Sequence, residues 1–281
     1  MTAAYDAGIN FFDGAEAYGA GKAELAMGRV LKKTRWPRDT FIVSSKVIQV
    51  GSRPTQRGLS RKHLVEACDA ALKRLGLDYL DLFFCHRPDP TTPLEEIVHT
   101  MNELIQRGKI FYWGTSEFPA SDVGELYAIA DRDRLVGPSM EQTVHSMLTR
   151  DRVEGDLRGV IERRGLGTTI YSPLAQGVLT GKYNDGVPEA SRLAQRAGQA
   201  GLTDEHVPTV RQLTAIAQEL GMNMAQLALA WCLRNPHVST AIVGATRPEQ
   251  VKDNASAADL VEKLTDDVMQ RIEQLLDNRP K

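Results

Sequence analysis

The chain has 281 residues, of which 42% are hydrophobic and 25% are charged, and its formal net charge is −2 at pH 7. Barrels of alternating strands and helices typically use about 250 residues for one domain, so we expect a single domain over residues 1–281. Lysines and arginines are scattered along the chain, which excludes the basic stripe of a nucleic-acid-binding protein. No apolar run reaches the roughly 18 residues that could span a bilayer, so we expect no membrane insertion.

The cysteines, Cys68, Cys85 and Cys232, stand far apart in the sequence and lack the spacing of metal ligands. Reduced thiols in a cytoplasmic protein are the plain interpretation. The histidines other than His86 show no ligand spacing either. The sequence therefore predicts no metal site.

Runs with β propensity alternate with helical patterns along the whole chain. The expected strands cover residues 9–12, 41–46, 79–86, 110–116, 138–142, 168–172 and 238–243. The expected helices cover residues 1–8, 23–33, 60–76, 93–107, 121–131, 152–164, 207–220, 223–234 and 265–276, and a further helix opens at a capping box in residues 246–249. Residues 173–191 form a loop of a length that is usually functional or disordered in compact domains.

This alternation predicts a parallel sheet covered by helices. The residues that close the first six strands are 26 to 40 positions apart, a spacing that suits the repeated strand-helix units of a (β/α)8 TIM barrel. A doubly wound open sheet is the alternative. It lacks its usual phosphate fingerprint here, because Glu24 stands where the third glycine after Gly19 and Gly21 belongs.

Three of the expected strands end in chemically useful residues. Asp13 closes the first strand, Lys46 the second and His86 the third, while Tyr18 follows Asp13 on the next loop. The carboxyl ends of the strands of a parallel barrel converge on one face, where catalytic groups of such barrels lie. A phenol is a weak acid with a pKa of about 10, and a neighbouring ammonium stabilises its phenolate. Such a group suits carbonyl reduction, with a proton from Tyr18 and a hydride from a nicotinamide cofactor.

Together these residues resemble the catalytic set of the aldo-keto reductase superfamily. The resemblance extends along the whole chain and points to the branch that contains the voltage-gated potassium channel β subunits and their bacterial relatives. It is carried by the segments 10–24, 57–63, 87–92, 112–116 and 231–235. The family implies catalytic roles for Asp13, Tyr18, Lys46 and His86, and this branch is often oligomeric, so a homo-oligomer is expected.

The resemblance also implies an NADP(H) site. Ser116 and Gln142 would bind the carboxamide, and Tyr171 would stack on the nicotinamide ring. The remaining expected contacts are Ser172, Pro173, Leu174, Ala175, Lys182 and Arg192 along the pyrophosphate, and Gly244, Thr246, Arg247, Gln250, Asp253 and Asn254 at the adenosine end. A helix N-terminus suits a phosphate, and Arg247 could bind a 2′-phosphate, which favours NADP over NAD.

Two positions depart from the family pattern. Glu117 stands where the superfamily often has Asn and the channel subunits have Arg, and His86 replaces the Asn of the channel subunits. The second difference favours a reductase of small aldehydes or ketones. The alternative is an NADP(H)-binding, redox-sensing subunit with slow or vestigial catalysis that regulates a membrane partner.

The chain begins inside an expected helix. Relatives have an N-terminal hairpin and a first barrel strand before this point, and the sequence lacks both. We therefore expect a barrel without its first strand and hairpin, and a truncated gene product is one explanation. A barrel that neither binds a cofactor nor reacts is a third functional alternative.

Overall fold

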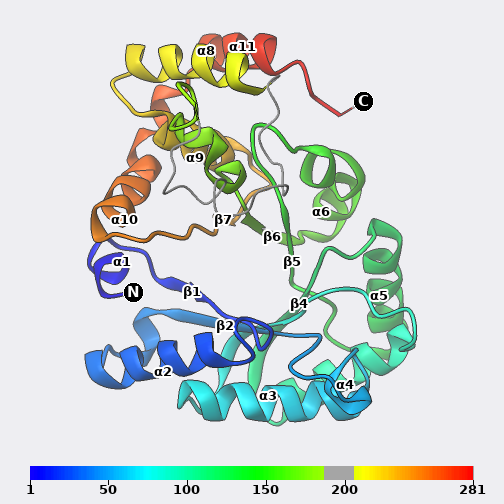
Figure 1. Ribbon diagram of the computed structural model, residues 1–281. Helices are drawn as coiled ribbons and strands as arrows, with labels where there is room; N and C mark the ends of the chain where they lie inside the picture. The colour runs from blue at the N-terminus through cyan, green and yellow to red at the C-terminus, as the bar shows by residue number, and fades with distance from the viewer. Residues whose placement is uncertain (187–205, 281) are drawn as a thin grey trace. The chain divides into compact units, whose positions relative to one another are not determined.

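The computed structural model describes residues 1–186 and 206–280 (Figure 1). The chain divides into two compact units. The first unit contains Met1–Gln142 and Gly159–Gly167, and the second contains Thr143–Arg158 and Thr168–Lys281.

Parallel strands form the centre of the first unit. They are β1 (Phe11–Asp13), β2 (Ile42–Val47), β3 (Leu80–Cys85), β4 (Ile110–Ser116) and β5 (Met140–Val144). Each pairs in parallel with the next strand along the chain, with Asp13 opposite Ser44 and Ser116 opposite Gln142. The carboxyl ends of these strands therefore lie at one edge of the sheet.

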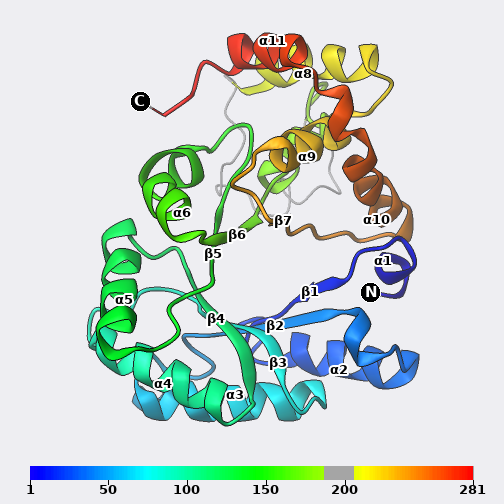
Figure 2. The ribbon, with the colours of Figure 1, turned by 180° about the vertical axis from the view of Figure 1, so that it is seen from behind.

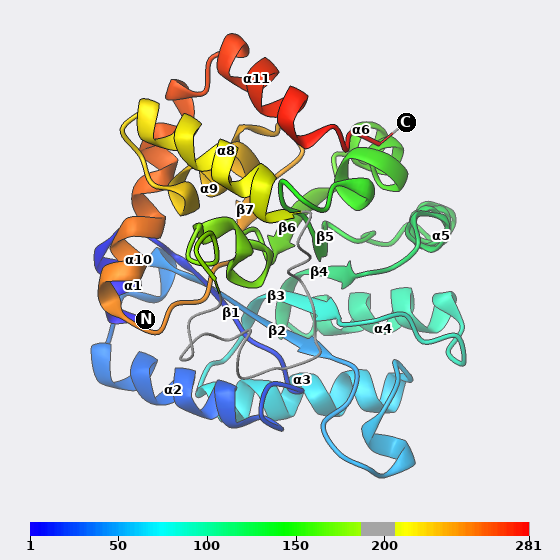
Figure 3. The same cartoon turned by 45° about the horizontal axis from the view of Figure 1, so that its top comes forward.

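Helices flank these strands along the chain. They are α1 (Thr2–Asp6), α2 (Lys22–Thr34), α3 (Arg61–Leu75), α4 (Leu94–Gln106), α5 (Ala120–Asp133) and α6 (Arg158–Arg164), with short 3-10 turns at Arg38–Thr40 and Pro54–Gln56. Helices α2 to α5 pack against one another in chain order around the strands (Figure 3).

Helix α3 shows why these segments are helical. Ser60 accepts a hydrogen bond from the backbone N–H of His63 and caps the first turn. The inward face buries Leu64, Ala67, Cys68, Ala71, Leu72 and Leu75, which recur with the helical period. Gly76 ends the helix at φ +69°, a left-handed conformation that glycine adopts without strain.

The second unit holds β6 (Gly167–Tyr171) and β7 (Thr240–Ala241), which also pair in parallel. Its helical segments are a π-helical turn at Asp151–Asp156, η4 (Ala175–Thr180), α8 (His206–Glu219), α9 (Met224–Arg234), α10 (Pro248–Ala255), η5 (Ser256–Lys263) and α11 (Asp266–Leu276). Helices α8 and α11 lie side by side, and α9 packs against both α8 and η5 (Figure 2).

In both units parallel strands alternate with helices, which confirms the predicted α/β class of the (β/α)8 barrel. All seven expected strands are present in the described part of the chain. Their bounds shift by one or two residues for most strands, and β7 is much shorter than the expected 238–243. No helix in the described residues is both long and apolar enough to cross a membrane.

Candidate active site

A buried ion pair lies at the carboxyl ends of β1 and β2. The side chain of Lys46 is fully buried, and its Nζ lies 2.5 Å from Oδ2 of Asp13. The same Nζ donates to the carbonyl of Gly14 at 2.8 Å and to the hydroxyl of Tyr18 at 3.2 Å. Three acceptors thus satisfy the ammonium, which a charge in the interior requires.

Tyr18 reaches this pair from the loop that follows β1. Its hydroxyl meets Lys46, while its ring meets His86 edge to face with 5.7 Å between ring centroids. Tyr18 is nevertheless 41% exposed, although the side chain of Lys46 that it contacts is fully buried. The phenol therefore contacts the buried ammonium on one side and remains open to a small molecule on the other.

His86 stands one residue beyond β3, and its backbone N–H donates to the carbonyl of Val47 at 2.9 Å. Burial, followed by the positive charges of Lys46 and Arg87, lowers the pKa of His86 to about 4, although Asp13 opposes this shift. The ring is therefore neutral at pH 7. Its Nδ1 is buried and has no hydrogen-bond partner among the residues that the structure describes.

The second carboxylate oxygen of Asp13 is held from two other strands. The hydroxyl of Ser44 on β2 donates to Oδ1 at 2.7 Å, and the side-chain amide of Gln142 on β5 donates to it at 3.2 Å. Gln142 is thus brought to the carboxylate of Asp13, and Ser116 lies opposite Gln142 on β4. The sequence did not indicate Ser44, because an inward serine in a strand has no distinctive pattern.

A second buried group supports the loop that carries Tyr18. Glu16 donates its backbone N–H to the carbonyl of Lys46 at 3.1 Å, and its Oε1 accepts the backbone N–H of Ile48 at 2.8 Å. His63 lies 3.5 Å from the same oxygen and is also buried. Burial alone would lower the pKa of His63, but its contacts with Glu16 and with the carbonyl of Gly58 raise it above 6.5. The sequence did not indicate this pair. In the structure it is recognisable because both side chains are buried.

The loops after β2 and β3 are joined by Asp89. Its carboxylate accepts the backbone N–H groups of Leu59 and Thr91 and the hydroxyls of Thr91 and Thr92. Burial alone would raise the pKa of Asp89, but these hydrogen bonds outweigh it and lower the pKa to about 2. The loops that adjoin Lys46 and His86 are therefore tied together.

Several expected cofactor contacts lie in the second unit. Tyr171 ends β6, and Ser172 follows at φ +55°, with Ala175 at φ +45° in the next turn. Ala175 donates its backbone N–H to the carbonyl of Ser172 at 2.8 Å, which closes a tight turn directly after β6. Pro173 and Leu174 lie within the same turn.

Lys182 and Arg247 could supply positive charge to a phosphate. Both side chains are exposed, and neither forms an ion pair with a described residue. Lys182 lies beside η4, since its Nζ would be only 3.0 Å from a Cβ placed on Gly177. These two cations fit the phosphates of a dinucleotide. Arg192 lies outside the described residues.

The start of α10 differs from the predicted capping box. The N-cap is Arg247 rather than Thr246, and Oε1 of Gln250 accepts the backbone N–H groups of both residues. Asp253 accepts hydrogen bonds from Asn223 and Gln226 of the preceding helix, which ties α10 to the N-terminus of α9. The remaining expected contacts, Gly244 and Asn254, have no described partner that assigns them a role.

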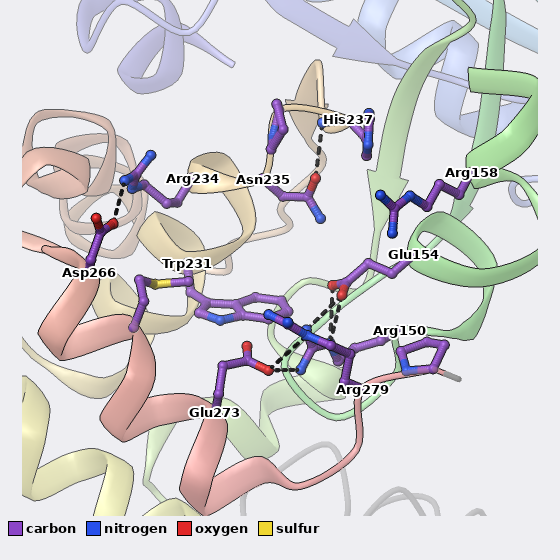
Figure 4. A pocket seen from close by; sticks show the side chains of 13 residues that line it. Arg150, Glu154, Arg158, Trp231, Arg234, Asn235, His237, Asp266, Glu273 and Arg279 are labelled. Carbon is purple, nitrogen blue, oxygen red and sulfur yellow. Dashed lines mark hydrogen bonds and ion pairs between the residues drawn. The ribbon is translucent and has the colours of Figure 1, made fainter. Parts of the chain in front are cut away.

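A cavity of about 430 Å³ lies within the second unit, and none of the predicted site residues lines it (Figure 4). Its wall contains Arg150, which binds Glu154 and Glu273 and lies with its guanidinium 5.1 Å from the ring centroid of Trp231. The charge of Arg150 is thus paired with the carboxylates of Glu154 and Glu273. The residues around Trp231 therefore stabilise this unit.

The chain was then compared with known proteins. The sequence profile of the Aldo/keto reductase family matches residues 1–277. The chain belongs to this family. The match agrees with the resemblance that the sequence motifs indicated.

Among similar proteins is a "Probable voltage-gated potassium channel subunit beta" of Arabidopsis thaliana, 46% identical over 98% of this chain and 86% of that protein. A protein of the same description from Oryza sativa subsp. japonica is 45% identical over 100% of this chain and 87% of its own length. A "Putative voltage-gated potassium channel subunit beta" of Schizosaccharomyces pombe is 44% identical over 99% and 83%, respectively. Both the family and the branch predicted from the sequence are therefore confirmed.

Proposed function

We propose that this protein reduces aldehydes or ketones to alcohols with NADPH. The observation that carries the proposal is the contact of the Tyr18 hydroxyl with the buried ammonium of Lys46. This ammonium is in turn paired with Asp13. A phenol held in this way can donate a proton. Among the residues whose contacts are described above, no other acid is exposed.

NADPH supplies, when bound, a hydride to the carbonyl carbon of the substrate. Tyr18 donates its proton to the carbonyl oxygen, so that hydride and proton together convert the carbonyl into an alcohol. Lys46 stabilises the phenolate that remains, because its ammonium stays within hydrogen-bond distance of that oxygen. Asp13 neutralises Lys46 in the interior and keeps it in place.

His86 orients the carbonyl in this scheme. The ring is neutral because its pKa is about 4, so it can offer one N–H as a hydrogen-bond donor without adding a charge. Since Nδ1 is buried, Nε2 is the nitrogen that we assign to the substrate. A donor placed at the oxygen that gains negative charge stabilises the transition state.

We assign NADP(H) binding to the residues that the family resemblance implies. Ser116 and Gln142 would hold the carboxamide, and Tyr171 would stack on the nicotinamide ring. The phosphates would be bound by the turn from Ser172 to Ala175, by Lys182 and by Arg247, and Gly244, Thr246, Gln250, Asp253 and Asn254 would adjoin the adenosine. Lys182 and Arg247 support this assignment, because their side chains are exposed and form no ion pair with a described residue.

A regulatory subunit that holds NADP(H) and turns over slowly is the second candidate. It is supported by the relatives described as channel β subunits, which match nearly the whole chain at 44–46% identity. A partner of such a subunit would be a membrane channel.

Titration with NADPH followed by nicotinamide fluorescence, and then by absorbance after addition of a reactive aldehyde, tests both candidates. Tyr18→Phe is the control, since it removes one hydroxyl and leaves the ring. Binding with turnover that Tyr18→Phe abolishes supports the reductase. Binding without turnover supports the regulatory subunit, and absence of binding refutes both.

A further inference from the structure

Arg87 directly follows His86 and is anchored over the ends of two strands. Its Nη1 donates to the carbonyl of His86 at 2.6 Å and to the hydroxyl of Ser116 at 3.0 Å. Both acceptors lie at the carboxyl ends of β3 and β4, beside the catalytic residues. The guanidinium is therefore held by one of its nitrogens on the side of the sheet where the substrate binds.

The charge of Arg87 is not neutralised. Arg38 pairs with Asp81, and Arg74 with Glu24, but Arg87 has no carboxylate partner among the described residues, and its side chain is exposed. The nearby carboxylate of Asp13 is already bound to Lys46, Ser44 and Gln142. The charges that act on His86 are those of the cations Lys46 and Arg87 and of the anion Asp13, so positive charge is in excess among them.

One edge of the guanidinium remains available. Both hydrogen bonds are made by Nη1, and Nε and Nη2 have no partner among the described residues. These two nitrogens form the planar fork that binds a carboxylate with two parallel hydrogen bonds. A planar carboxylate matches this fork more closely than a bulky apolar group does.

We propose that Arg87 binds a carboxylate on the substrate, so that the site selects short aldehydes or ketones that carry an acid group at the other end. This inference rests on the proposed reductase function. Arg87 would act as a specificity residue, because the carboxylate that it binds is remote from the reacting carbonyl. A neutral carbonyl compound would be reduced without this contact.

The test compares 4-oxobutanoate with butanal, which have the same four-carbon chain but differ in the terminal carboxylate. The wild-type protein should have a kcat/KM about 10- to 100-fold higher for 4-oxobutanoate, since hydrogen bonds to a charged group contribute this much discrimination. Arg87→Met, which keeps the length of the side chain, should abolish the preference by raising KM for 4-oxobutanoate, so that the two aldehydes have similar kcat/KM values. Arg87→Lys should retain part of the preference for 4-oxobutanoate.

Arg29→Met is the matched control, because Arg29 is an exposed arginine of α2 that forms no ion pair with the part of the chain that the structure describes. It removes the same charge away from the strand ends and should leave the preference unchanged. Equal preference in the wild type and in Arg87→Met would overturn the inference. A parallel fall for both aldehydes in Arg87→Met would do the same, since it would show that Arg87 only supports Ser116.

A binding measurement separates this inference from the proposed function. Butyrate and butyramide are titrated calorimetrically into the protein alone and with NADP⁺. Butyrate should bind more tightly than butyramide, and Arg87→Met should weaken butyrate binding by about 10-fold or more. This result supports a carboxylate site even if neither aldehyde is reduced. Equal affinity of the wild type and Arg87→Met for butyrate refutes it even if both aldehydes are reduced.

Discussion

Replacing Lys46 alone, and then Lys46 and Asp13 together, should affect stability and catalysis differently. The single variant should lose both, whereas the double variant should regain stability but not turnover. Lys46→Met leaves the carboxylate of Asp13, whose side chain is only 8% exposed, without its cation. Breaking a buried pair in this way costs about 3–5 kcal/mol. For a chain of this size the melting temperature should fall by roughly 6–20 °C. Ser44 and Gln142 still bind Asp13, which favours the lower end of this range.

The double variant Asp13→Asn/Lys46→Met removes both charges. Its amide can still accept from Ser44, so most of the lost stability should return. Turnover should not return, because Tyr18 has lost the ammonium that stabilises its phenolate, and the loss should be about 10²–10⁴-fold in both variants. Urea unfolding and aldehyde-dependent NADPH oxidation measure the two effects. A double variant as unstable as Lys46→Met, or a Lys46→Met protein with wild-type turnover, would refute this account of the pair.

The other predictions concern positioning, acid stability and cofactor affinity. Glu16→Leu removes the acceptor of the Ile48 N–H and should lower kcat by about 10- to 100-fold through misplacement of the loop, whereas Glu16→Gln keeps an acceptor and most activity. Asp81→Asn is the control, since Asp81 accepts a β2 N–H at the other end of that strand, and an equal kcat loss there would contradict the positioning role. Burial and then the charge of Arg150 lower the pKa of His145 to about 4, below its usual 6.5. The neutral ring therefore contributes stability that is fully present above pH 6.5 and is lost as the pH falls toward 4, roughly 3 kcal/mol in all. Urea midpoints at pH 7 and pH 4.5 should differ less in His145→Phe than in the wild type, and an equal difference would refute this. Lys182→Met should weaken NADPH binding by about 10-fold without changing kcat at saturation, and an unchanged dissociation constant would exclude its role at the phosphates.

The proposed catalytic residues could be predicted from the sequence mainly because three of them stand at the ends of expected strands. An apolar run followed at once by Asp13, Lys46 or His86 marks a strand end, and parallel strands bring such ends together. The structure confirms that Lys46 contacts both Asp13 and Tyr18, and that Tyr18 meets His86. Strand periodicity and parallel topology therefore predict the positions of Asp13, Lys46 and His86, whereas Tyr18 lies on a loop and is assigned from the family resemblance.

The supporting residues could not be predicted in the same way. Glu16 and His63 are polar residues in a turn and in the first turn of a helix, where exposed side chains are the usual expectation. Their burial arises only when α3 packs beside the end of β2. Arg87 was noticed as part of a family segment, but its lack of a carboxylate partner is a property of the folded chain. The shift of the α10 cap from Thr246 to Arg247 likewise depends on the side chain of Gln250.

The reductase and regulatory candidates make different demands on His86. A redox sensor benefits when bound NADPH is oxidised slowly, whereas a reductase benefits from a neutral donor at the carbonyl oxygen. Burial and the charges of Lys46 and Arg87 keep this ring neutral, and the hydrogen bond to Val47 fixes its backbone. Tyr18 is exposed beside it, so a carbonyl oxygen could contact both groups. Because these features together favour proton donation to a bound carbonyl, we rank turnover above sensing for this chain.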